Sequence, residues 1–90
     1  MKIMNDNYQI NMYLFTKYIN KILKDEPLVT GWAFEINHHG TYELIVSIDY
    51  IDRLHSKEMY DLHNRDIDEL RRDFQFYLNR NISQIGVSEL

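Results

Sequence analysis

Residues 28–52 read LVTGWAFEINHHGTYELIVSIDYID and decide the fold of this chain. Two runs within them, 28–37 and 41–52, alternate apolar with polar residues, which is the pattern of half-buried strands. Between the runs, Asn37-His38-His39-Gly40 supplies an asparagine at the start of a turn and a glycine for a left-handed position. The sequence therefore predicts an antiparallel hairpin. We expect its inward face to carry Leu28, Thr30, Trp32, Phe34 and Ile36 opposite Tyr42, Leu44, Val46, Ile48 and Tyr50.

A helix is predicted on each side of this hairpin. Residues 6–24 begin with Asp6 and Gln9 at capping-box spacing, and Pro27 ends the element. A second helix starts at Asp66, where Glu69 completes another capping box, and it is expected to end at Arg80. The tail, residues 81–90, is either a short docked segment or a frayed end.

Residues 53–63 are compatible with two structures. Glu58, Tyr60 and Leu62 alternate with Lys57, Met59 and Asp61, as in a third strand, whereas Ser56 would cap a helical turn instead. We favour the strand. The resulting order, α-β-β-(β)-α, predicts an α+β fold in which two helices pack on one face of a small antiparallel sheet. Residues 1–90 are expected to form a single domain.

Composition excludes several classes of protein. The chain has 90 residues, of which 44% are apolar, and it has no cysteine, so disulfides, zinc–thiolate sites and thiol catalysis are excluded. Mean hydropathy is −0.48, and no apolar run approaches the length of a membrane span. The opening residues, MKIMNDNYQI, lack the apolar stretch of a secretory signal. We therefore expect a cytoplasmic protein with no membrane contact.

Charge is distributed unevenly along the chain. Residues 1–24 carry four lysines against Asp6, a net charge of +3, and residues 70–90 carry a net charge of +1. Residues 25–69 carry eleven acids against three bases, a net charge of −8. Such a concentrated field would attract a basic partner surface, although a solvated acidic face would also explain it. The candidate partner-binding residues are Asp49, Asp52, Glu58, Asp61, Asp66, Asp68 and Glu69.

A second candidate surface lies on the first predicted helix. Ile10, Tyr13 and Leu14 fall on or beside its lysine-bearing side, away from the main apolar stripe. Exposed apolar residues grouped on a helix can mark a partner surface. We keep these three residues as an alternative interface, which would suit a homodimer.

No motif for catalysis or metal binding is present. The four histidines lack HExxH or comparable spacing. Many nucleases need an acid two positions before a lysine on a hairpin, and no lysine of this chain has one. The glycine-rich loops that hold phosphates are also missing. We expect no metal site, no cofactor and no enzymatic activity.

The order of elements resembles that of the double-stranded-RNA-binding domain over residues 6–80. That family grips the RNA backbone with lysines at the start of its second helix. The matching position here reads Asp66-Ile67-Asp68-Glu69, which has the wrong sign for phosphate contact. The same acidic balance argues against direct nucleic-acid binding of any kind.

Size, acidity, layout and a residue usage typical of AT-rich genes resemble those of small phage-encoded inhibitors of host defence, the anti-CRISPR proteins. Several members of that class mimic nucleic acid with carboxylates. The resemblance implies a non-enzymatic inhibitor of a basic host protein, such as a nucleic-acid-guided nuclease, whose phosphate sites the seven candidate acids would occupy. The alternatives are an immunity or antitoxin-like partner of a basic enzyme and a homo-oligomeric regulatory subunit.

Overall fold

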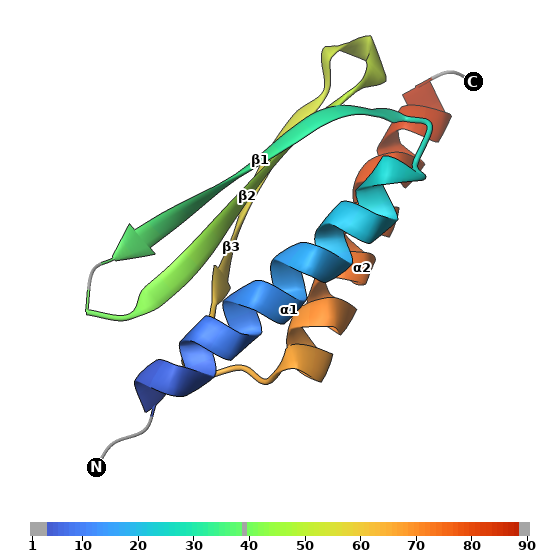
Figure 1. Cartoon of the computed structure of the whole chain (residues 1–90). Coiled ribbons are helices and arrows are strands. Elements are labelled where there is room, and N and C mark those ends of the chain that lie inside the picture. The colour runs from blue at the N-terminus through green and yellow to red at the C-terminus, as the bar shows by residue number, and fades with distance from the viewer. Residues whose placement is uncertain (1–3, 39, 89–90) are drawn as a thin grey trace.

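The computed structural model describes residues 4–38 and 40–88 and confirms the α-β-β-β-α order (Figure 1). His39, in the predicted turn, and the last two residues of the tail lie outside the described part. The elements are α1 (Met4–Lys24), β1 (Val29–His38), β2 (Tyr42–Tyr50), a single 3-10 turn η1 (Ile51–Arg53), β3 (His55–Asp61) and α2 (Ile67–Ser88).

The three strands form one antiparallel sheet in the order β1-β2-β3, with β2 in the centre. Both helices lie on the same side of this sheet (Figure 1). The predicted hairpin is confirmed: Trp32 pairs with Ile48 and Phe34 with Val46. Gly40 adopts a φ of 85°, the left-handed conformation expected of it. Residues 55–61 form the third strand, so the helical alternative for this segment is wrong.

The core lies between the sheet and the two helices. Phe15 of α1 meets the ring of Phe74 of α2 edge to face at 6.1 Å and that of Tyr60 of β3 at 5.0 Å. These edge-to-face contacts are the preferred packing of aromatic rings. The apolar side chains that are at least nine-tenths buried come from α1, α2, β2, β3 and the residue that follows β3: Phe15, Ile19, Leu23, Leu44, Val46, Ile48, Tyr50, Tyr60, Leu62, Leu70, Phe74, Leu78 and Ile85.

The expected inward face of the first strand is only partly buried. Trp32 and Phe34 are half-buried, and Ile36 is 41% exposed. The reason is that β1 is an edge strand, so side chains on its outer flank have no neighbouring strand. Trp32 nevertheless donates a hydrogen bond from its indole Nε1 to Asn20 of α1 at 2.8 Å.

The tail is helical, so the predicted end of the second helix at Arg80 is wrong. Helix α2 continues to Ser88 because Asn81 and Ile85 extend its buried stripe. Asn81 donates a hydrogen bond from its side chain to the hydroxyl of Tyr50 at 3.1 Å. This contact joins the last turns of α2 to the end of β2. No helix in the described part of the chain is long and apolar enough to cross a membrane.

A strained turn connects β2 to β3. Asp52 and Arg53 both have positive φ, 62° and 63°, and the N–H of Leu54 donates to the carbonyl of Ile51. Two successive left-handed residues are what a type I′ hairpin turn requires, and this turn matches the twist of the flanking strands. Residues other than glycine, asparagine and aspartate have a steric cost in this conformation.

Replacing Arg53 with glycine is expected to stabilise the protein. Glycine removes the steric cost at positive φ, and the gain should be about 0.5–1 kcal/mol after its greater flexibility in the unfolded chain is counted. Urea unfolding of both proteins measures the difference. A lower free energy of unfolding in the variant would contradict this account of the turn.

Candidate functional site

The seven predicted acids do not form one surface. Asp49 pairs with His55 at one end of the β2–β3 ladder, and Glu43 pairs with Asp61 at the other. The two pairs stand six residue steps apart along β2, which corresponds to about 20 Å. Asp49 and Asp52 therefore lie at one end of the molecule, whereas Asp61, Asp66, Asp68 and Glu69 lie at the other.

Glu58 belongs to neither end. It stands opposite Val46 in the ladder, so its side chain lies on the helix-covered face of the sheet. Burial raises the pKa of this carboxyl; the Met59 N–H and the charge of Arg80 act in the opposite direction, and the charge of Asp73 reinforces the rise. A half-buried carboxylate on this face is poorly placed to contact a partner.

Replacing Glu58 with glutamine should stabilise the protein at neutral pH. A carboxyl whose pKa is higher in the folded than in the unfolded state destabilises the fold when ionised, and this effect disappears as the pH falls through the folded pKa. Urea unfolding should therefore show a gain at pH 7 that shrinks towards about pH 4. An equal gain at both pH values would contradict the assignment. Glu35→Gln, on the uncovered sheet face, is the matched control.

Asp61, at the end of β3, holds the loop that leads into α2. Its Oδ1 accepts hydrogen bonds from the backbone N–H groups of His63 and Asn64, at 2.8 and 3.0 Å, and its Oδ2 accepts one from the Asn64 amide at 2.7 Å. Partial burial acts to raise the pKa of this carboxyl, but these hydrogen bonds and the nearby His63 outweigh it and lower the pKa. Asp61 is thus ionised and fixed in orientation.

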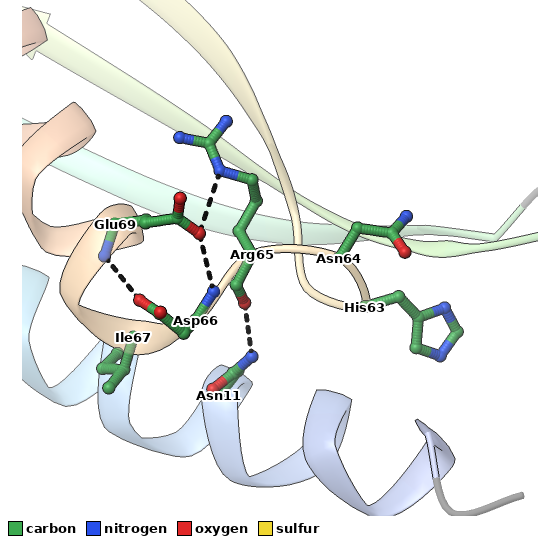
Figure 2. A pocket seen from close by; sticks show the side chains of 7 residues that line it. All are labelled: Asn11, His63, Asn64, Arg65, Asp66, Ile67 and Glu69. Carbon is green, nitrogen blue, oxygen red and sulfur yellow. Dashed lines mark hydrogen bonds and ion pairs between the residues drawn. The ribbon is translucent and has the colours of Figure 1, made fainter.

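The predicted capping box at the start of α2 is present. Asp66 Oδ1 accepts from the N–H of Glu69 at 2.9 Å, and Glu69 Oε1 accepts from the N–H of Asp66 at 3.2 Å. Arg65 lies beside this box, with its Nε 3.6 Å from Glu69, and its guanidinium donates to Asp73 one turn further on. Asp68 is exposed in the same first turn. Figure 2 shows the side chains of Arg65, Asp66 and Glu69 together.

A polar hollow of about 450 Å³ opens at this end of the molecule (Figure 2). Asn11 of α1 lines this hollow, and its side-chain amide donates hydrogen bonds to the carbonyl oxygens of Leu62 and Arg65, at 3.0 and 2.9 Å. These two hydrogen bonds tie the β3–α2 loop to α1. We name Asp61, Asp66, Asp68 and Glu69, with the hollow beside them, the acidic end. Sequence reasoning missed Asn11, because nothing in its local sequence indicates which loop it contacts.

The opposite end holds the other two acids in a different setting. Asp49 lies 2.6 Å from His55 Nδ1, and both side chains are more than half exposed. Asp52 occupies the strained turn described above. These two carboxylates are therefore separate from the acidic end, and each has a different structural role.

The alternative interface is only partly exposed. Ile10 and Tyr13 are 55% and 61% exposed on α1, whereas Leu14 is half-buried beside Tyr18 and Arg71. Tyr13 and Ile36 border the same shallow groove between α1 and β1. The sequence did not indicate that Ile36 lies near Tyr13.

His38 and His63 make structural ring contacts. His38 stacks on Tyr42 at 4.2 Å, Tyr42 stacks on Tyr8 at 3.8 Å, and the ring of His63 meets both tyrosines edge-on at 5.4 Å. This cluster joins α1, the hairpin and the β3–α2 loop. Among residues 4–38 and 40–88, no group of three or more metal-ligating side chains comes together.

Comparison with protein-family models, with curated proteins and with solved structures finds no match for this chain. Its function is therefore inferred from its own residues and their geometry.

Proposed function

We propose that this chain is a non-enzymatic cytoplasmic protein that binds a basic, nucleic-acid-binding host protein through the acidic end and thereby inhibits it. One observation carries the proposal. Four of the seven candidate carboxylates lie within nine residues around the start of α2, and hydrogen bonds within the chain fix three of them. Spaced, fixed negative charges are what a surface built for phosphates would accept.

The way these carboxylates are held favours binding. Side chains that are already ordered lose less conformational entropy when a partner arrives. The N-terminus of α2 also carries a partial positive charge, which offsets the mutual repulsion of Asp66, Asp68 and Glu69 in the free protein. The charge of Arg65 in the wall of the hollow beside them is balanced by Glu69 and Asp73, so the carboxylate of Asp66 in the same wall remains to attract an arginine or lysine side chain of the partner.

Charge separation across the molecule supports an oriented approach. The lysines Lys17, Lys21 and Lys24 lie exposed on the C-terminal half of α1, remote in sequence from the acidic end. A basic surface would be drawn to the acidic end, whereas at the opposite end these lysines offset the charges of Asp25, Glu26, Asp49 and Asp52, which favours one orientation and raises the association rate.

Competition with nucleic acid tests the proposal. The tagged protein captures partners from host extract, and each captured protein is purified and bound to immobilised chain in the presence of its own DNA or RNA ligand. We expect a basic partner whose nucleic acid displaces the chain competitively. A partner that binds chain and nucleic acid at once would contradict mimicry. A captured basic enzyme with no nucleic-acid site would favour the immunity-type alternative instead.

A further inference from the structure

Beyond the register shift between Val29 and Gly31, strand β1 is an unprotected sheet edge. Its ten residues include one formal charge, Glu35, and contain no lysine, arginine or proline. Edge strands of stable monomers are commonly short, charged or kinked, because a free edge pairs readily with another strand. The other edge, β3, follows that rule: it has seven residues, with Lys57 exposed and the carboxylate of Glu58 on its inward face.

An apolar groove runs along the unprotected edge. It measures about 360 Å³ and lies between α1 and β1, with Leu44 of β2 as its buried floor. Tyr13 and Ile36, which are 61% and 41% exposed, form its rims. The groove and the free edge thus face the same side of the molecule. A single binding partner could fill both if it supplied a strand to the edge and apolar side chains to the groove.

We propose that the occupant is a second copy of this chain, with the two β1 strands paired antiparallel in a register centred on Phe34. In this register Phe34 faces Phe34 of the second copy, and Trp32 faces Ile36 of the second copy. Every pair among these helix-facing positions is apolar, which is a favourable cross-strand arrangement. The two sheets join into one of six strands.

The charges of α1 fit the same arrangement. Its lysines, Lys17, Lys21 and Lys24, all lie in the C-terminal half, and residues 4–16 contain none. Because α1 is the helix beside β1, antiparallel strands place the two α1 helices side by side and antiparallel. The lysine-bearing half of one then faces the lysine-free half of the other, and the helix dipoles oppose each other favourably. The acidic end, on β3 and α2, stays free in the dimer.

Sedimentation velocity with a matched pair of variants tests the dimer. Ile36→Lys places a charge on the proposed interface, and Met59→Lys places the same charge on β3, where Met59 is 51% exposed. At about 100 μM we expect wild type and Met59→Lys to sediment at twice 11.0 kDa. We expect Ile36→Lys to raise the dimer dissociation constant at least about tenfold. Circular dichroism melting confirms that both variants fold.

Two other outcomes would overturn the proposal. Wild-type protein that sediments at 11.0 kDa throughout leaves the groove to another occupant, such as an extended peptide of a partner. A dimer that Met59→Lys disrupts and Ile36→Lys does not would place the interface elsewhere.

The absence of native cysteine allows a direct test of the register. With Phe34 at the centre, residue 33 of one copy stands directly opposite residue 35 of the other, within disulfide range. The double variant Ala33→Cys/Glu35→Cys should therefore cross-link under mild oxidation, and neither single variant should, because equal positions lie diagonally about 7 Å or more apart. Cross-linking of a single variant alone would overturn the register.

Discussion

Replacing Phe74 with alanine should destabilise the protein by about 3–5 kcal/mol. Phe74 is 1% exposed, and its ring packs against those of Phe15 and Tyr18 on α1 and of Tyr60 on β3. Alanine removes these contacts and leaves a cavity where α1, β3 and α2 meet. Small domains have total stabilities of only about 5–15 kcal/mol, so the variant should melt more than about 10 °C below the parent.

Phe76 supplies the matched control on the same helix. It is 67% exposed, so Phe76→Ala should change the free energy of unfolding by less than about 0.5 kcal/mol. Chemical unfolding followed by circular dichroism measures both variants. Equal losses of stability in the two variants would show that the buried stripe of α2 is assigned wrongly.

Neutralising the acidic end should weaken partner binding at least tenfold, which corresponds to about 1.4 kcal/mol. The variant is Asp61→Asn/Asp66→Asn/Asp68→Asn/Glu69→Gln. Asparagine still caps helices and forms the turn at position 61, so the backbone hydrogen bonds to Oδ1 survive, while four charges and the Oδ2 bond to the Asn64 amide are lost. The loss should appear mainly as slower association, with weaker dependence on salt.

The control removes four charges from the other end of the molecule. Asp25→Asn/Glu26→Gln/Asp49→Asn/Asp52→Asn makes the same change in net charge near the η1 turn. Surface plasmon resonance against the purified partner, at low and high salt, should show near-parental affinity for this control. Equal losses in both variants would mean that net charge alone, and no particular surface, governs binding.

Local signals predicted the elements of the fold well. The capping box of Asp66 and Glu69 and the left-handed Gly40 occur where the sequence indicated them, because each depends on neighbours within a few residues. Asn81 was misread for the opposite reason. Its place in a helix depends on Tyr50, thirty-one residues away, whose hydroxyl accepts its hydrogen bond.

Burial and the candidate site depend on register and strand order, which alternation does not reveal. Alternation placed Trp32 and Ile36 on the inward face, but only the strand order shows that β1 is an edge that leaves Ile36 41% exposed. Glu58 was grouped with Asp61 by charge, yet the β2–β3 register turns Glu58 inward while Asp61 caps the loop. The short loop between β3 and α2 brings the four carboxylates of the acidic end together. The charge count along the chain gave no means of separating them from the acids at the opposite end of the molecule.

Hydrogen exchange of the chain, free and bound to its partner, tests the proposed function most directly. The account predicts that binding slows amide exchange over residues 61–72, from the end of β3 through the first turns of α2. Exchange near η1 and the start of β3 should stay unchanged. Slower exchange confined to residues 49–57, or to the groove between α1 and β1, with residues 61–72 unaffected, would contradict it.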